Sequence, residues 1–245
     1  MINQKVALIS GGNRGLGFET ATQLGKEQVT VIIGSRQLSD AKEAVRKLRL
    51  MDIDAYGIEL DVTNDAHRKS AAGYIEEAFG KLDILINNAG VVPEGFTTSP
   101  LNSATSPEEF DFVFKTNFFS VVHLTHQLLP LLRKSSAGRI VNLASAVGSL
   151  TLQSMDNSPL AAFRSLAYNS SKTALNMFTI LLAEELRNTN IKVNSAHPGW
   201  VKTEMGTAAA PMEIKDGAKT SLQLALLDQD GPSGKFIHMG EQLPW

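Results

Sequence analysis

The feature that most constrains the fold is a regular alternation between short apolar segments rich in β-branched residues and longer segments with helical spacing of apolar residues. Strands buried on both faces read as continuous apolar runs, and helical crossovers join neighbouring parallel strands. The alternation therefore predicts an α/β fold, a doubly wound parallel sheet of about seven strands with helices on both faces. We expect strands near residues 5–10, 29–34, 54–60, 82–87, 138–143, 191–197 and 234–239.

The composition of the chain limits its organisation and excludes several classes of function. With 245 residues, 43% of them apolar, the chain suits one sizeable core, and we expect one domain over residues 1–245. A formal net charge of −2 leaves no basic face for a nucleic acid. The absence of cysteine excludes disulfides, cysteine-ligated metals and a thiol nucleophile, and suits a cytoplasmic protein. No apolar run reaches about 18 residues, so we expect no membrane span.

A glycine-rich turn follows the first predicted strand. The segment "SGGNRGLG", from Ser10 to Gly17, runs into a helical segment. Glycines let the backbone turn sharply and approach a diphosphate, whose charge is favoured by the N–H groups at a helix start. The glycine spacing differs from the commoner G-x-G-x-x-G. Its position nevertheless predicts a Rossmann-type dinucleotide site, with these cofactor-binding residues: Gly11, Asn13, Arg14, Gly15, Leu16 and Gly17.

The end of the second predicted strand indicates which dinucleotide would bind. Folds of this type often place an acidic residue there to hold the ribose 2′-hydroxyl. This chain has Ser35 and Arg36 instead, and Arg14 in the glycine turn can lie on the same side. Two guanidiniums would attract a 2′-phosphate, so we expect NADP(H) rather than NAD(H). The alternative is that both arginines are only solvated.

Two further strand ends would contact the cofactor. Asp61 and Val62 end the third predicted strand and would flank an adenine ring. Asn88, Ala89 and Gly90, in the segment "NNAG", end the fourth, where small residues let a cofactor lie across the sheet. Either segment could instead be an ordinary strand-to-loop turn.

Tyr168 and Lys172 are spaced for joint chemistry. Residues four apart on a helix lie on one face, so the phenol and the ammonium can share a small volume. Tyr56 and Tyr74 have no lysine four positions later. The alternative is a core tyrosine beside a solvated cation.

Taken together, these motifs resemble the short-chain dehydrogenase/reductase family from end to end, and its carbonyl-reductase branch in particular. The matching segments are "SGGNRGLG", "NNAG", "KTN", "NLAS", "YNSSK", "HPGWVKT" and "GKFIHMGEQLPW". The resemblance implies a catalytic tetrad and a segment that holds the nicotinamide carboxamide. The implied tetrad is Asn117, Ser145, Tyr168 and Lys172, and the carboxamide residues are Pro198, Gly199, Val201 and Thr203.

The resemblance also implies a role for each member of the tetrad. Tyr168 would donate a proton to the substrate oxygen, and Lys172 would lower its pKa together with the oxidised cofactor. Ser145 would donate a hydrogen bond to the same oxygen, and Asn117 would hold a water that reaches Lys172. The alternatives are that Ser145 only forms a turn and that Asn117 is a structural amide joining a helix to a strand.

Two features depart from the common pattern of the family. Ser10 replaces a threonine and keeps the hydroxyl, so little should change. Ser145 and Tyr168 are 23 positions apart, about ten more than in common members, as in monomeric carbonyl reductases.

The long apolar helices predicted over residues 107–132 and 168–187, which contain Asn117 and Tyr168, would form a homodimer contact or pack only within the chain. We therefore expect a monomer or a homodimer through these helices.

Three loops at the carboxyl ends of strands should form the substrate pocket, near residues 91–106, 146–166 and 203–213. The last would be a mobile lid. Their apolar residues suit aliphatic or aromatic carbonyl substrates, and Arg164 is the only basic candidate for a carrier-protein partner. The expected lining is Leu150, Leu152, Met155, Leu160, Phe163, Trp200 and Met205.

The best-supported function is an NADPH-dependent carbonyl reductase, with several alternatives. A reductase of 3-oxoacyl thioesters or steroids, an alcohol dehydrogenase, and an NADP-sensing module without turnover share the same fold. The chain has no G-x-S-x-G for a serine hydrolase and no P-loop. His123 and His126 have no acidic partner nearby, so we expect no metal site.

Overall fold

A computed structural model of the chain describes residues 4–93 and 102–245. Its centre is an eight-stranded sheet in the order β3-β2-β1-β4-β5-β6-β7-β8. All neighbouring strands are parallel except β7 and β8. The strands are β1 (Val6–Ser10), β2 (Thr30–Ser35), β3 (Ala55–Glu59), β4 (Ile84–Asn87), β5 (Arg139–Leu143), β6 (Lys192–Ala196), β7 (Lys235–His238) and β8 (Glu241–Gln242).

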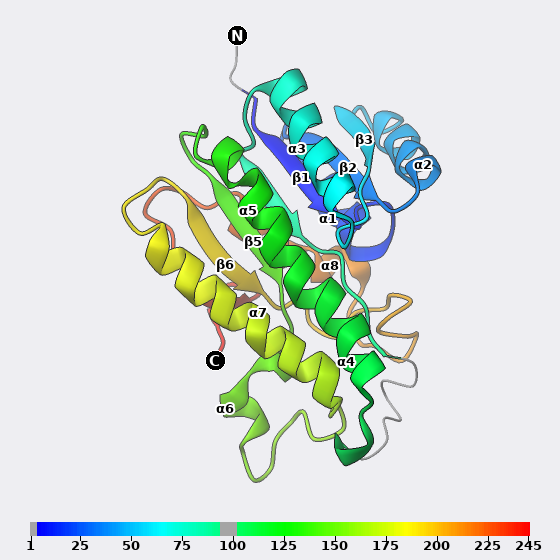
Figure 1. The fold of residues 1–245 in the computed structure, drawn as a ribbon, viewed down its shortest axis with the longest axis vertical. Coiled ribbons are helices and arrows are strands. Elements are labelled where there is room, and N and C mark those ends of the chain that lie inside the picture. The colour runs from blue at the N-terminus through cyan, green and yellow to red at the C-terminus, as the bar shows by residue number, and fades with distance from the viewer. Residues whose placement is uncertain (1–3, 94–101) are drawn as a thin grey trace.

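The helices cover both faces of this sheet, as expected for a doubly wound fold. Figure 1 shows α3, α5 and α7 in front of the sheet, with α1 and α2 on the other side. The longer helices are α1 (Gly15–Lys26), α2 (Leu38–Arg49), α3 (Asp65–Phe79), α4 (Pro107–Phe114), α5 (Ser120–Leu132), α7 (Leu166–Glu185) and α9 (Lys219–Ala225). The short ones are α6 (Leu150–Gln153), α8 (Ile214–Gly217), and the 3₁₀ turns η2 (Asn102–Ala104) and η4 (Ala146–Gly148).

Two apolar layers hold the helices to the sheet. One contains buried side chains of α3, α5 and α7, such as Ile75, Leu128 and Leu182. The other contains side chains of α1, α2 and α9, such as Leu24 and Leu48. Because strand residues alternate between the two layers, each inner strand contributes apolar side chains to both. This explains why the strands read as continuous apolar runs in the sequence.

The predicted strands and long helices are confirmed, with small differences at their ends. β8 is an additional strand of two residues, paired antiparallel to β7, and is too short to give a sequence pattern. The first long helix is continuous but contains a π-helical turn, η3 (Lys115–Phe119), between α4 and α5. α7 begins at Leu166 rather than Tyr168, because the hydroxyl of Ser165 accepts a hydrogen bond from the Tyr168 N–H.

The topology places the candidate site at one edge of the sheet. Strand order reverses between β1 and β4, and ligands of open α/β sheets bind beyond the carboxyl ends of the strands at such a point. The glycine turn follows β1 and the "NNAG" segment follows β4, so these two motifs are neighbours. Of the predicted loop 91–106, residues 94–101 lie outside the described residues.

No helix among the described residues is both long enough and apolar enough to cross a membrane.

Candidate active site

The glycine turn after β1 is locked to the end of β4. The Asn88 side chain donates to Ser10 O at 2.8 Å and to Gly11 O at 3.0 Å. In return, the Ser10 hydroxyl accepts hydrogen bonds from the N–H groups of Asn88 and Ala89. Asn88 is predicted to bind the cofactor, and its side chain holds the glycine turn. The Ser10 hydroxyl, which a threonine would also supply, holds the same two segments together.

Close approach of backbones explains the glycines of this turn. Gly11 and Gly15 have φ values of +61° and +55°, in the left-handed region that favours glycine. A Cβ on Gly17 would lie 2.4 Å from Gly11 O and 2.5 Å from the amide nitrogen of Asn88. α1 begins at Gly15, so its first N–H groups face the turn, with Asn13 and Leu16 half-buried beside them. This is a backbone cradle of the kind that holds a diphosphate.

The end of β2 carries no acidic side chain. Ser35 is buried and Arg36 is exposed. Burial raises the pKa of the neighbouring Asp61 carboxyl, but hydrogen bonds from Thr63 and the charges of His67 and Arg36 outweigh burial and lower it. Arg36 is therefore close to Asp61, while Val62 is buried beside it.

The second predicted phosphate ligand, Arg14, has a different neighbour. Its guanidinium forms an ion pair with Glu204 at 2.5 Å, and both side chains are largely exposed. Glu204 belongs to the loop after β6, whose Thr203 lies 3.8 Å from the position of a Cβ on Gly15. The ion pair therefore joins the glycine turn to this loop. Arg14 and Arg36, predicted to bind one 2′-phosphate together, have different acidic neighbours, Glu204 and Asp61.

Ser145, Tyr168 and Lys172 converge at the carboxyl end of β5. Ser145 follows β5, and its side chain hydrogen-bonds to Tyr168 in the first turn of α7. The Lys172 ammonium lies 5.6 Å from the centre of the Tyr168 ring and donates to Leu143 O at 2.8 Å. Tyr168 and Lys172 are 7% and 6% exposed. The three side chains therefore occupy one nearly dry site.

Burial dominates the acid–base properties of this pair. It raises the pKa of Tyr168 to about 12, although the hydrogen bond with Ser145 acts in the opposite direction. Burial also lowers the pKa of Lys172 to about 8. Among the protein's own groups, burial therefore outweighs any lowering of the Tyr168 pKa, and the joint effect expected of Lys172 and the oxidised cofactor stays a prediction. Desolvation of the phenol is the larger effect, and Tyr168 is a neutral hydroxyl near pH 7.

Asn117 lies in the π-helical turn and is fully buried. Its amide is bound on both sides to the backbone of Val91, at 2.8 Å in each direction, and its nitrogen also donates to the Ser171 hydroxyl. The side chain is thus a structural amide that joins this helix to the segment after β4. That Asn117 also holds a water for Lys172 stays a prediction.

Gly90 fits between these groups. A Cβ at this position would lie 3.4 Å from the Asn117 side-chain oxygen and 3.8 Å from the Lys172 ammonium. The "NNAG" segment therefore lies directly beside Asn117 and Lys172. This proximity supports the prediction that Ala89 and Gly90 face a cofactor next to the tetrad.

The segment after β6 closes the site on the other side. Pro198 and Gly199 are half-buried, and Gly199 has a φ of +89°. Val201 is buried, and its pairing with Met212 closes the loop that contains Thr203. The expected lid is thus a loop tied at its base.

Sequence reasoning missed one residue of this segment, His197. Its Nδ1 accepts the N–H of Ala146, the residue after Ser145, at 3.2 Å, and its carbonyl is bound by the His238 ring at 2.9 Å. Burial, followed by the proximity of His238, lowers the pKa of His197 to about 3. His197 is therefore a neutral acceptor that supports the turn after Ser145. Its place beside "PGWVKT" was the available signal.

A second missed feature is a buried polar chain beneath the site. Asn87, Asn142 and Ser195 stand at matching register on β4, β5 and β6. Asn87 donates to the Asn142 side chain, and both Asn142 and Ser195 donate to Thr179 of α7. An amide or hydroxyl late in each otherwise apolar strand was the sequence signal.

The substrate loops lie around the tetrad only in part. Phe163 and Trp200 pack edge to face, with ring centres at 5.2 Å, which brings the predicted loop 146–166 next to the segment after β6. Leu150 and Arg164, in contrast, line a cavity of about 530 Å³ on the outer side of α7 that does not include Tyr168. These two residues are therefore not placed in a common pocket with the tetrad. No cluster of metal ligands is found within the described parts of the chain.

The geometry fits a nicotinamide dinucleotide. The glycine cradle, the small residues after β4 and the segment after β6 surround the carboxyl ends of β1, β4 and β5, next to the phenol and ammonium. A family model described as short chain dehydrogenase matches residues 5–214. The chain belongs to the short-chain dehydrogenase/reductase family. It is an oxidoreductase that uses a nicotinamide cofactor.

Relatives in this family match the whole chain. Short-chain dehydrogenase/reductase 1 of Saponaria officinalis is 31% identical over 297 residues, covering 100% of this chain and 97% of the relative. The structure of NADPH-bound carbonyl reductase from chicken fatty liver has a TM-score of 0.85 and 26% identity, covering 99% of each chain. That of salutaridine reductase from Papaver somniferum has a TM-score of 0.82 and 30% identity, covering 95% of this chain and 99% of the other.

Proposed function

We propose that this protein is an NADPH-dependent carbonyl reductase that transfers hydride to a ketone or aldehyde, with Tyr168 as general acid. The convergence of Ser145, Tyr168 and Lys172 in one buried site carries the proposal. A module that only senses NADP would not need a phenol, a hydroxyl and an ammonium together. In this proposal the whole chain acts as one cofactor-binding domain.

The chemistry follows from where charge develops. A bound nicotinamide cofactor supplies the hydride, and the carbonyl oxygen then becomes negative. The hydroxyl of Tyr168 gives this oxygen a proton, and Ser145 donates a hydrogen bond to it. Lys172, held by Leu143 O, places a positive charge beside the phenolate that forms. Because the site is nearly dry, each of these interactions is stronger than in water.

The cofactor preference rests on the cations at the end of β2 and in the glycine turn. Ser35 is buried at the end of β2, and Arg36 is exposed beside Asp61. Because β2 does not end in an acidic residue, this position does not repel a 2′-phosphate. Arg36→Ala should weaken NADPH binding about tenfold and leave NADH binding nearly unchanged, because it removes one charge-assisted hydrogen bond. Arg187→Ala, an exposed arginine paired with Glu184 far from the cradle, is the matched control. An unchanged NADPH/NADH ratio in Arg36→Ala would remove the assignment.

The substrate class is proposed from the loops and from the relatives. Phe163 and Trp200 form an apolar wall, which suits aliphatic or aromatic carbonyl compounds. One structural neighbour is named a carbonyl reductase and another salutaridine reductase. Oxidation of NADPH with a panel of ketones, aldehydes, a 3-oxoacyl thioester and a keto-steroid would rank these classes. NADPH binding without turnover on any of them would favour the sensing module.

The assembly and location of the protein are part of the same proposal. Apolar side chains stay exposed on the helices that contain Asn117 and Tyr168, namely Phe112, Phe119, Met177 and Leu181. They would be covered in a homodimer and would stay solvated in a monomer, which sedimentation would distinguish. A chain without cysteine is suited to the reducing cytoplasm.

A further inference from the structure

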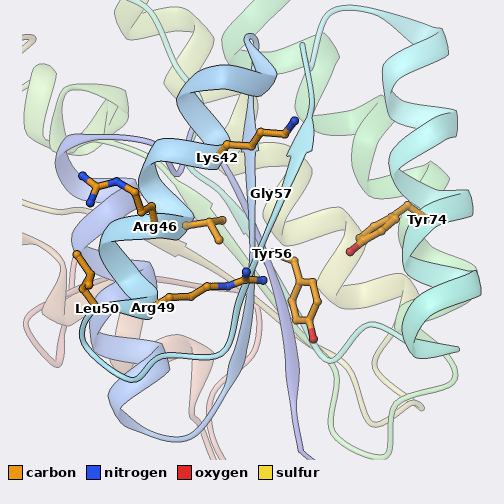
Figure 2. Close-up of a pocket in the computed structure, with 8 residues that line it drawn as sticks. Lys42, Arg46, Arg49, Leu50, Tyr56, Gly57 and Tyr74 are labelled. Carbon is orange, nitrogen blue, oxygen red and sulfur yellow. The ribbon is translucent and has the colours of Figure 1, made fainter.

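A cavity of about 620 Å³ lies far from the catalytic groups, along the edge strand β3. α2 forms one wall and α3 the other, and β3 lies between them (Figure 2). The polar groups around it come from Lys42, Arg46 and Arg49 of α2, Tyr56 and Gly57 of β3, and Tyr74 of α3. None of the residues that line it is acidic.

The floor of the cavity presents unpaired backbone. β3 bonds to β2 through Asp54 O and Leu60 N–H. Since every second residue of an edge strand faces its one neighbour, Ala55 and Gly57 direct their backbone groups outward. Arg49 covers the Ala55 carbonyl with two hydrogen bonds, at 2.8 and 3.1 Å. The Gly57 N–H has no partner among the described residues and no side chain to shield it.

The cations of α2 differ in how far they are neutralised. Arg46 is bound by Glu43 through two hydrogen bonds of 2.9 Å, and Figure 2 shows it directed away from Tyr56. Lys42 has no ion-pair partner within the described parts of the chain and extends toward β3 in Figure 2. Arg49 uses Nε and one Nη on Ala55, so its other Nη stays available. Two cationic donors are therefore free on this side.

The aromatic side of the cavity is closely packed. Phe79 packs edge to face against both tyrosines, with ring centres at 5.2 Å from Tyr56 and 6.2 Å from Tyr74. The Arg49 guanidinium lies 5.8 Å from the centre of the Tyr56 ring. Burial, and then Tyr56, raise the pKa of Tyr74, whereas Arg49 opposes this rise, so the three groups are within electrostatic reach. Figure 2 shows Tyr74 extending from α3 toward Tyr56.

We propose that this groove, defined by Lys42, Arg49, Tyr56, Gly57 and Tyr74, is a second binding site, for a small organic phosphate. The phosphate lies at the Gly57 N–H, between the free Nη of Arg49 and the Tyr74 hydroxyl, and the exposed Lys42 side chain turns toward it on binding. Its organic part lies against the Tyr56 ring and the aliphatic side chains of α2.

Three observations favour this ligand class. The four polar groups along the groove are hydrogen-bond donors, two of them cationic, and this set matches the acceptor oxygens of a phosphate. The volume lies within the range of about 300–1,000 Å³ that small-molecule sites occupy. Arg49 covers the Ala55 carbonyl, so an extended peptide cannot continue the ladder there, and such capping protects edge strands against added chains. The site is independent of the proposed catalytic activity.

The test is a titration of the full chain with phenyl phosphate, followed by the backbone amide NMR signals. We expect saturable shifts centred on Gly57. Lys42→Met and Tyr74→Phe should each weaken binding about tenfold, because each removes one hydrogen bond to a charged group. Both changes are conservative, since Lys42 is exposed and phenylalanine keeps the packing of Tyr74 on Phe79.

Lys47→Met is the matched control. It removes the same charge from the same helix, but Lys47 is paired with Glu43 and does not line the cavity. Its effect should stay within about twofold, as for a surface charge. Equal losses in Lys42→Met and Lys47→Met would mean unspecific attraction and overturn the proposal. Shifts confined to the glycine turn, or equal affinity for the uncharged benzyl alcohol, would overturn it as well.

Discussion

His197 makes the stability of this protein sensitive to acid in a way that can be calculated. Burial, together with nearby His238, lowers the pKa of His197 from 6.5 to about 3. Between these two pH values the unfolded chain binds a proton that the folded chain does not. The free energy of unfolding must therefore fall as the pH is lowered through this window. The full displacement corresponds to about 5 kcal/mol, at about 1.4 kcal/mol for each pH unit.

The assay is urea denaturation of wild type and His197→Asn at several pH values between 4 and 8. Asparagine keeps an oxygen that can accept the Ala146 N–H but does not titrate. As the pH is lowered below 6.5, we expect the unfolding free energy of the wild type to fall more steeply than that of His197→Asn, by about 1.4 kcal/mol per pH unit. His123→Asn, which changes an exposed histidine of α5, should keep the wild-type slope. The same slope in all three proteins would refute the reasoning.

The same contact should affect catalysis, because Ala146 follows Ser145. His197→Leu leaves the buried Ala146 N–H without a partner, which costs about 1–3 kcal/mol. The turn after Ser145 would then be less well fixed. We expect kcat to fall in His197→Leu and to be largely restored in His197→Asn. Equal activity of the two variants would show that this hydrogen bond does not position Ser145.

Two further substitutions test the cradle and the serine. Gly17→Ala places a Cβ 2.4 Å from Gly11 O, so it should weaken cofactor binding by about tenfold or more and destabilise the fold by about 1–3 kcal/mol. The control is Gly73→Ala on α3, whose Cβ would meet nothing within 4 Å. Equal cofactor affinity of the two variants in calorimetric titrations would contradict the role given to the glycine turn. Ser145→Ala removes a hydrogen bond that lowers the pKa of Tyr168, so kcat should fall about tenfold. In the pH profile of kcat, the limb assigned to Tyr168 should move to higher pH, whereas the control Ser154→Ala should leave it in place. An unmoved profile in Ser145→Ala would count against the contact.

The sheet, its two layers of helices and the position of the site follow from local sequence patterns. Continuous apolar runs predict buried parallel strands, and the glycine turn after β1 predicts a helix start at the cofactor. Such features depend on neighbours in the chain. β8 and the π-helical turn around Asn117 were not predicted, because each depends on contacts with distant segments, β7 for the first and Val91 for the second.

The electrostatics of the site were the least predictable part. The spacing of Tyr168 and Lys172 predicts that they meet, and they do, at 5.6 Å from ring centre to ammonium. The direction of the pKa shift of Tyr168 depends on how completely the phenol is desolvated, which spacing does not contain. In the same way, the sequence places Arg14 near Arg36, but the loop that brings Glu204 to Arg14 is distant in the chain.

The central claim is that Tyr168 is the general acid of a carbonyl reductase. The most direct measurement compares the turnover of NADPH with a reducible ketone in wild type, Tyr168→Phe and the control Tyr56→Phe, after binding of NADPH to each has been measured. Loss of a general acid typically costs about 10²–10⁴ in rate. We predict a loss of this size in Tyr168→Phe, with unchanged NADPH binding and wild-type turnover in Tyr56→Phe. A turnover of Tyr168→Phe within about tenfold of wild type would contradict the account, because such a loss is smaller than removal of a general acid produces.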